Sequence, residues 1–158
     1  MVSMTDVSQI LDVARTVIIG LGALFAVFQL REIARDRKFQ LVVNLCSQYL
    51  SELTEPYCKL FSEEYADPAE MEKKVTYERL FKLAAFYEAV GLMVRGRHVD
   101  AHLVMEYLPI IDVWEKMKPW AFWYREKTKF PAYWEHFEYL ANATRDYLKS
   151  RGIVLGQN

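Results

Sequence analysis

The chain has 158 residues, of which 53% are hydrophobic and 15% aromatic, and this composition excludes a disordered chain. The formal net charge of −1 excludes a global attraction to nucleic acid or to an anionic bilayer, and the sequence carries no signal for DNA binding. Six glycines and five prolines leave few residues for the turns of an all-β domain, whereas helix-period spacing dominates. We therefore expect an all-α fold.

The first element is an apolar run at residues 16–30, TVIIGLGALFAVFQL. At about 1.5 Å per residue, its fifteen residues cover roughly 22 Å, which is shorter than a hydrocarbon core of about 30 Å. The residues before it extend the run, because the stem of Arg15 can lie in lipid while its charge reaches the headgroups. The run is apolar on all sides, unlike a surface helix. These features predict a transmembrane helix, with a helix buried in protein as the alternative.

The charges around the run are asymmetric. Arg15 alone precedes it, whereas Arg31, Arg35, Arg37 and Lys38 follow it closely. By the positive-inside rule, this asymmetry predicts a single-pass protein of the inner (cell) membrane with its N-terminus outside and its C-terminal domain in the cytoplasm. A cleaved signal peptide would need the opposite order of charges.

Three residues in and just before the run are spaced seven apart: Arg15, Gly22 and Gln29. Small and polar residues on one face of a spanning helix normally turn toward other helices. Because the sequence has one such run, those helices would come from other copies. The stripe therefore predicts a homo-oligomer with a polar, pore-like path lined by these residues; chance placement is the alternative.

The helical phase continues past the basic cluster and predicts one apolar face that ends where Thr54, Glu55 and Pro56 stop the helix. That face comprises Phe39, Val42, Val43, Cys46, Tyr49, Leu50 and Leu53. A short helix is expected over residues 56–65, and a longer one starts at Asp67-Pro68 and runs to Val94.

The second half of the chain predicts further helices. Gly96 is expected to cap one helix, Asp100 to begin another that ends at residue 108, and Pro109 to open a third. Pro119 is expected to kink or restart that helix, and Pro131 to open the last one, which ends near residue 152. The expected organisation is a tail, transmembrane helix and basic segment (1–38), a cytoplasmic helical bundle (39–152) and a tail (153–158).

The turn RGRHVDAH at residues 95–102 is the strongest catalytic candidate. Arg97 and His102 have Arg-x4-His spacing, which is similar to the signature of HEPN-type ribonucleases, where a histidine handles protons and an arginine steadies charge. Arg95 and His98 add to a patch that could instead bind phosphate or nucleotide, or be a solvated turn. His98 and His102 with Asp100 have metal-like spacing, but His98 is expected to lie before the helix start, and we predict neither a metal nor a cofactor.

Residues 114–130, WEKMKPWAFWYREKTKF, interleave aromatic residues with cations. The cations of interest are Lys116, Lys118, Arg125 and Lys127. Such a surface could stack nucleic-acid bases or lie against a membrane; core packing with a solvated face is the alternative.

Four segments in their order carry a family resemblance: QLREIARDRKFQ, YERLFKLAAFYEAVGLMVRGRHVD, IIDVWEKMKPW and YWEHFEYLA. Together with the apolar run they resemble a bacterial and phage family of small membrane-anchored helical proteins of unknown function. They are more loosely similar to the membrane accessory proteins encoded beside RNA-targeting CRISPR effectors, which implies a HEPN-like domain, a membrane ring and anti-phage activity.

We expect a non-enzymatic, self-associating membrane protein that perturbs or gates the membrane, as in antiviral defence. One alternative is a membrane-tethered HEPN-like ribonuclease acting on RNA. The other is a passive module that binds a nucleotide or a defence-effector partner. The sequence contains no Gly-rich phosphate loop, nucleophile elbow, paired zinc cysteines or Glu-x-x-His motif.

Overall fold

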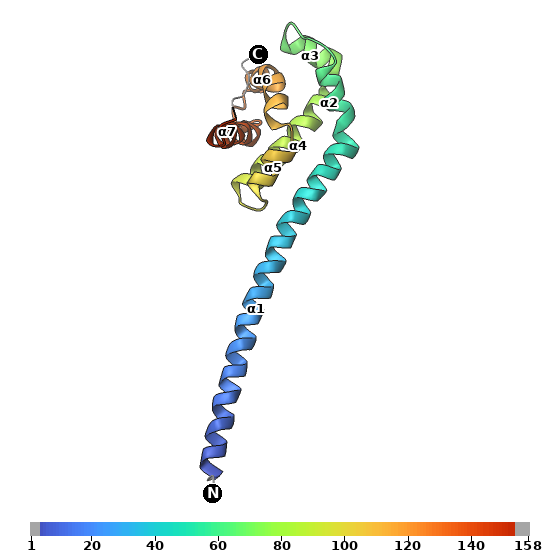
Figure 1. Cartoon of the computed structure of the whole chain (residues 1–158). Helices are drawn as coiled ribbons and strands as arrows, with labels where there is room; N and C mark the ends of the chain where they lie inside the picture. The colour runs from blue at the N-terminus through green and yellow to red at the C-terminus, as the bar shows by residue number, and fades with distance from the viewer. Residues whose placement is uncertain (1–3, 154–158) are drawn as a thin grey trace. The chain divides into compact units, whose positions relative to one another are not determined.

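The computed structural model describes residues 4–153, with side chains from Arg15 onward. This part of the chain is helical and contains no strand, which confirms the expected all-α class (Figure 1). The elements are α1 (Met4–Gln48), the π-helical segment η1 (Tyr49–Leu53), α2 (Thr54–Phe61), α3 (Pro68–Val75), α4 (Tyr77–Arg95), α5 (Ala101–Tyr107), α6 (Ile110–Thr128) and α7 (Glu135–Ser150).

The chain divides into two compact units, one ending at Phe39 and the other beginning at Gln40. The first unit is the greater part of α1. The second unit contains the end of α1 and all later helices, and it holds every residue of the buried core. Each unit is described by itself below.

The helix that begins as α1 continues through η1 and α2 to Phe61, so the expected stop at residues 54–56 is wrong. Proline lacks an N–H, and in a regular α-helix its ring collides with the carbonyl four residues earlier. The π-helical turn immediately before Pro56 widens the backbone there, and the Thr54 hydroxyl donates to the Leu50 carbonyl at 2.7 Å. The widened turn takes up the proline without ending the helix.

The face that this helix buries also differs from the expected one. Val42, Leu45 and Leu53 are buried, whereas Val43 and Leu50 are exposed. Successive residues on a helix are separated by about 100°, and on this helix Val42 lies on the side toward the core and Val43 on the side toward solvent.

A break at Thr76 divides the long helix expected from Asp67 to Val94 into α3 and α4. Asp67 caps α3 as predicted, since its carboxylate accepts a hydrogen bond from the Glu70 N–H at 2.7 Å. At Thr76 the backbone turns to φ 78°, which no helix accommodates. The break allows α3 to pack on α4 and on α6, contacts that one continuous helix could not make.

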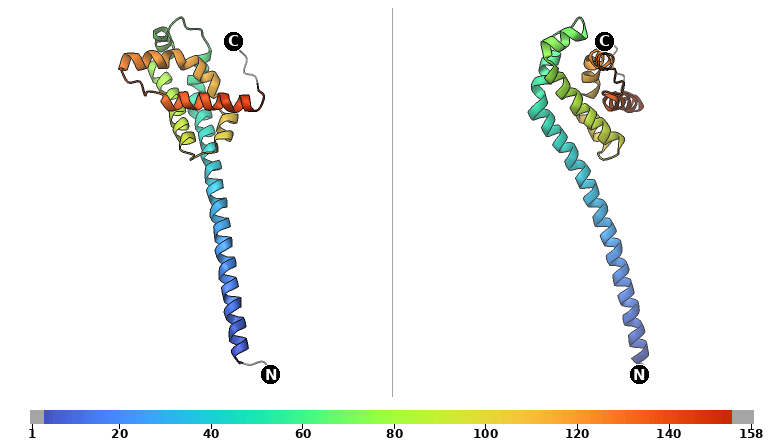
Figure 2. Two further views of the ribbon diagram at one scale, coloured as in Figure 1. Left: turned by 90° about the vertical axis from the view of Figure 1, so that its left-hand side faces the viewer. Right: turned by 180° about the vertical axis from the view of Figure 1, so that it is seen from behind.

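The packing of α4 against α7 is the most extensive contact in the second unit, and Figure 2 shows the two helices crossing. Tyr87 on α4 stacks on Phe137 of α7 with 4.7 Å between ring centroids. At Gly91 the backbones approach so closely that an added Cβ would lie 2.1 Å from the His136 carbonyl oxygen. Glu88 also joins the helices, because its carboxylate accepts from the Phe137 N–H at 2.8 Å and lies 2.9 Å from His136 Nδ1.

Neither of two prolines in the C-terminal half begins a helix. Pro119 lies inside α6, which runs on without a restart. The last helix begins at Glu135 and not at Pro131, because Trp134 takes a left-handed backbone conformation with φ 62°. A left-handed conformation is unfavourable for tryptophan. Burial of the Trp134 side chain, which is 4% exposed, offsets this cost.

Candidate functional site

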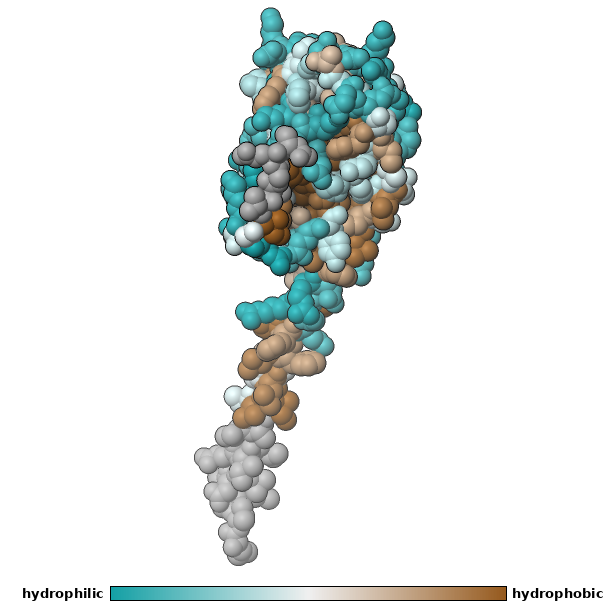
Figure 3. Space-filling model, turned by 45° about the horizontal axis from the view of Figure 1, so that its top comes forward, coloured by the Kyte–Doolittle hydropathy of each residue, from teal (hydrophilic) through white to brown (hydrophobic). Residues whose placement is uncertain are grey.

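The apolar part of α1 is exposed along its whole described length. Every side chain from residue 15 to residue 30 is exposed in the single chain, and Figure 3 shows this segment as brown side chains followed by a teal band. The most exposed large side chains are Ile18 (69%), Phe28 (68%) and Leu30 (66%). The helix contains one stretch long and apolar enough to cross a membrane, and none of that stretch is buried in the protein.

The stripe predicted to line a pore lies within this helix. Arg15, Gly22 and Gln29 are separated by seven residues each, which is about two helical turns, so they lie near one face. An added Cβ on Gly22 would meet no atom within 4 Å in the single chain, and the same is true of Gly20. The stripe is therefore open to a partner helix.

The basic turn after α4 is a helix-capping motif. The His98 N–H donates to the Met93 carbonyl at 2.9 Å and the Arg97 N–H to the Val94 carbonyl at 3.0 Å, the paired bonds of a Schellman motif. Gly96 (φ −77°) is the C-cap residue, as expected, and the left-handed residue that the motif needs is the next one, Arg97 (φ 59°).

Gly96 also has a steric role in this turn. An added Cβ there would lie 2.7 Å from Cδ2 of His98, so the glycine makes room for the imidazole ring.

Two residues of the turn, Arg95 and His102, contact opposite ends of α7. Arg95 forms an ion pair with Glu135 at 2.9 Å, at the start of α7. The His102 ring lies 4.9 Å from the ring of Tyr147, near the end of α7. Twelve residues of helix separate Glu135 from Tyr147, which corresponds to about 18 Å. Among the described residues, no hydrogen bond or ion pair joins Arg97 to His102.

The polar side chains around α5 form hydrogen bonds and ion pairs within the protein. Asp100 accepts hydrogen bonds from the His102 and Leu103 N–H groups and caps the helix as predicted. The Tyr147 hydroxyl, together with the guanidinium of Arg151, holds the pKa of Glu106 below its usual range. Within the described part of the chain, no three His, Cys, Asp or Glu side chains form a group that could hold a metal ion.

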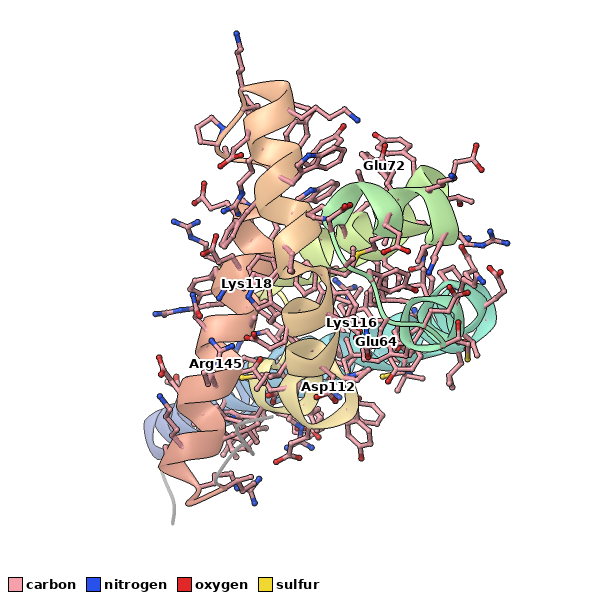
Figure 4. The ribbon with its side chains drawn as sticks, turned by 90° about the horizontal axis from the view of Figure 1, so that it is seen from above. Glu64, Glu72, Asp112, Lys116, Lys118 and Arg145 are labelled. Atoms are coloured by element: carbon pink, nitrogen blue, oxygen red, sulfur yellow. The ribbon has the colours of Figure 1, made fainter. Side chains whose placement is uncertain are left out.

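The aromatic and cationic segment is divided between the core and the surface of α6. Trp114 and Trp120 are 2% and 0% exposed, so neither is available to stack a nucleic-acid base. In Figure 4, Lys116 points toward Glu64, and the two form an ion pair at 3.2 Å. Lys118 lies on another side of α6, with its Nζ 5.9 Å from the ring of Phe122.

The other two cations of α6 are also engaged with neighbouring groups. Arg125 pairs with Glu138 at 2.8 Å and donates to the Tyr133 carbonyl at 2.6 Å. The Nζ of Lys127 lies 4.4 Å above the ring of Trp123 and 3.4 Å from a carboxylate oxygen of Glu72. Their charges are thus largely compensated within the protein.

The second unit also contains an apolar groove that the sequence interpretation missed. It lies between the end of α1 and α4, has a volume of about 560 Å³, and is lined chiefly by Leu45, Gln48, Phe81, Ala85, Ala89 and Met93. The signal in the sequence was the absence of any charged residue from 39 to 51. Interface cores are depleted of charge, so an uncharged run of this length favours packing against other apolar groups over a solvated helix, although Glu78 and Lys82 also line the groove.

These features define an all-α protein whose N-terminal helix has the length and composition of a membrane span. The chain belongs to the family described as a domain of unknown function, DUF4760, whose model matches residues 16–144. The match agrees with the resemblance to a family of unknown function, and its description names no activity. No curated protein and no solved structure matches the chain.

Proposed function

We propose that this is a single-pass membrane protein whose copies associate through α1 and thereby perturb or gate the membrane. The exposure of the apolar helix over residues 15–30 carries the proposal. Exposed apolar surface costs about 25 cal/mol per Å² in water, and large side chains such as Ile18 and Phe28 repeat along this helix. A bilayer removes that surface from water, whereas the rest of the single chain leaves it uncovered.

The charges that follow the helix support an orientation with the C-terminal unit in the cytoplasm. Arg31, Arg35, Arg37 and Lys38 are exposed, and Arg35 forms an ion pair with Glu32 on the same helix, at 2.5 Å. Basic residues beside a span favour the cytoplasmic side, where anionic headgroups attract them.

The stripe within the helix supports association between copies. A glutamine in hydrocarbon is satisfied best by another polar group, and Gln29 of another copy of α1 can provide one. Gly22 on the same face permits the close backbone approach that such packing needs. A ring built on this face would place Arg15 and Gln29 along a polar path. The looser resemblance to CRISPR-associated membrane proteins supports a role for this path in antiviral defence.

Carbonate extraction tests the anchor. The full-length protein is expected to stay with membranes, whereas a variant carrying Leu21→Lys and Leu24→Lys is expected to be extracted, because charge at the bilayer centre is costly. The matched control is Leu92→Lys, since Leu92 is an exposed leucine of α4. If the wild-type protein is extracted as readily as the double variant, the membrane assignment is wrong.

Light scattering in detergent and dye release from phospholipid vesicles test association and permeabilisation. We expect the wild-type protein to form particles of several copies and to release dye. Gly22→Leu should reduce both, because the larger side chain holds helices apart at the stripe. Gly20→Leu, two residues away, is the control with an equally open environment. A monomeric wild-type protein, or equal effects of the two variants, would overturn the proposed association.

A further inference from the structure

One side of α1 combines an apolar surface with three basic residues. Arg31, Arg35 and Lys38 follow one another at spacings of four and three residues, so they lie within about 60° of one another around the helix. Nearer the N-terminus, the large apolar side chains within about 80° of Arg31 continue this side: Val17, Leu21, Leu24, Val27 and Phe28. All of these side chains are exposed in the single chain. We call them together the basic side of α1.

The opposite side of α1 carries the stripe, and the stripe continues beyond the apolar run. Asp36 follows Gln29 by seven residues, the interval that separates Arg15, Gly22 and Gln29. At about 100° per residue, Asp36 lies about 140° around the helix from Arg31. The charges after the run are therefore sorted around the helix, with Asp36 on the side of the stripe and the three cations of the basic side facing away from it.

The distances along the helix bring the basic side within reach of lipid headgroups. Arg31 follows Phe28 by three residues, or about 5 Å, which is roughly the depth of the headgroup layer outside a hydrocarbon core. Arg35 and Lys38 lie further along, but side chains on an α-helix tilt toward its N-terminus, which here is the direction of the apolar run. Long arginine and lysine side chains bridge the remaining distance. The three cations can thus reach the phosphates of lipids whose chains contact Phe28.

The charge of these residues identifies the class of lipid. A guanidinium binds phosphate through two parallel hydrogen bonds, and each basic residue near an anionic surface increases the affinity about fivefold. A zwitterionic headgroup attracts the cations less, because its own ammonium group compensates the phosphate. On the opposite side, anionic headgroups repel the Asp36 carboxylate. Arg35 also pairs with Glu32 at 2.5 Å, so we expect Arg31, the cation closest to the apolar run, to contribute most.

We propose that the basic side of α1 binds anionic phospholipids of the cytoplasmic leaflet, with a phosphate group near Arg31 and Lys38 and an acyl chain along Leu24 and Phe28. This contact fixes the rotation of the helix in the bilayer, so that the stripe and Asp36 face away from these lipids. The inference rests on the proposed membrane anchoring, and it adds the class of lipid and the side of α1 that contacts it.

Fluorescence quenching by brominated lipids tests the contact in the full-length protein. The native thiols are removed by Cys46→Ala and Cys58→Ser, and a fluorophore is attached to a single new cysteine, either Leu24→Cys on the basic side or Ala26→Cys. Ala26 lies about 140° around the helix from Arg31 and is also exposed. Each labelled protein is reconstituted into phosphatidylcholine vesicles that contain the same fraction of brominated phosphatidylglycerol or of brominated phosphatidylcholine.

We expect brominated phosphatidylglycerol to quench the fluorophore at residue 24 more strongly than brominated phosphatidylcholine does, with no such preference at residue 26. Arg31→Gln should reduce the preference by up to about fivefold. Arg37→Gln is the matched control, because it removes the same charge at a position about 120° around the helix from Arg31 and should leave the preference unchanged.

Equal quenching by the two lipids at residue 24, in protein that resists carbonate extraction, would overturn this inference alone. Equal preferences at residues 24 and 26, or equal effects of Arg31→Gln and Arg37→Gln, would show attraction by the basic cluster as a whole and overturn the assignment to one side. A wild-type protein that carbonate extracts from membranes would remove both this inference and the anchoring on which it rests.

Discussion

The close approach of α4 and α7 at Gly91 makes the stability of the second unit sensitive to a single methyl group. In a Gly91→Ala variant the new Cβ would lie 2.1 Å from the carbonyl oxygen and 2.5 Å from the carbonyl carbon of His136. Real Cβ atoms essentially never approach another atom within 3.0 Å. Because the atoms in the way are backbone atoms, the two helices must move apart by about 0.9 Å, the difference between 3.0 and 2.1 Å.

Three effects determine the size of the change. Overpacking of this kind costs about 1–3 kcal/mol, and weakening the hydrogen bond from the Phe137 N–H to Glu88 costs about 1 kcal/mol more. Alanine is a better helix former than glycine by about 1 kcal/mol, which offsets part of the cost. The net destabilisation is then about 1–3 kcal/mol. For a domain of this size it lowers Tm by roughly 4–12 °C.

Tryptophan fluorescence during thermal unfolding in detergent measures this change, because Trp114 and Trp120 are buried in the core of the second unit. Gly20→Ala is the matched control, since a Cβ at that position of α1 meets no atom within 4 Å. The control should leave the unfolding of the second unit unchanged. If Gly91→Ala unfolds at the wild-type temperature or above it, helix propensity has outweighed the clash, and the packing of α4 on α7 differs from that described.

Three further substitutions test separate features. Arg97→Gly should raise the free energy of unfolding by about 1 kcal/mol, because a left-handed residue is strained unless it is glycine. Arg97→Lys keeps the Cβ and should leave Tm unchanged. A lower Tm for the glycine variant would contradict the capping motif. Glu88→Ala should lower the free energy of unfolding by about 1 kcal/mol or more, because the Phe137 N–H loses its acceptor. Glu88→Gln keeps an acceptor oxygen and should lower it less. Equal losses in thermal unfolding would show that the hydrogen bond from Phe137 to Glu88 does not stabilise the start of α7. Burial raises the pKa of Tyr49 from 10.0 to about 12, so as the pH rises this tyrosine ionises in the unfolded chain before it does so in the folded protein. Denaturant titrations should therefore show the free energy of unfolding falling between about pH 10 and 12. Tyr49→Phe should reduce that fall, and an unchanged pH profile would show that Tyr49 is not its source.

The sequence predicted local features well where one residue type has a local structural effect. Asp67 and Asp100 were expected to cap helices and do so, because a short carboxylate reaches the free N–H groups of the first turn without help from the rest of the fold. The prolines were less informative. Pro56 and Pro119 lie within helices, because a widened turn or the surrounding packing compensates for the missing hydrogen bond.

The candidate catalytic turn stays a prediction, because sequence spacing alone does not fix how its side chains are arranged. Arg95 and His102 are close in sequence, yet Arg95 pairs with Glu135 and the His102 ring lies against Tyr147. The distance between functional groups depends on the turn geometry and on where α7 passes, and neither is encoded in the spacing.

The sequence by itself determined the all-α class and the continuous apolar surface of residues 16–30, since both follow from residue type and helical period. Only the tertiary structure decided which side of α1 faces the core. Periodicity placed Val42, Val43 and Leu50 on one broad apolar face, and several apolar stripes would have satisfied it equally. Packing against the other helices selected Val42 and Leu45 and left Val43 and Leu50 in solvent, because one helix can turn only one side toward a core.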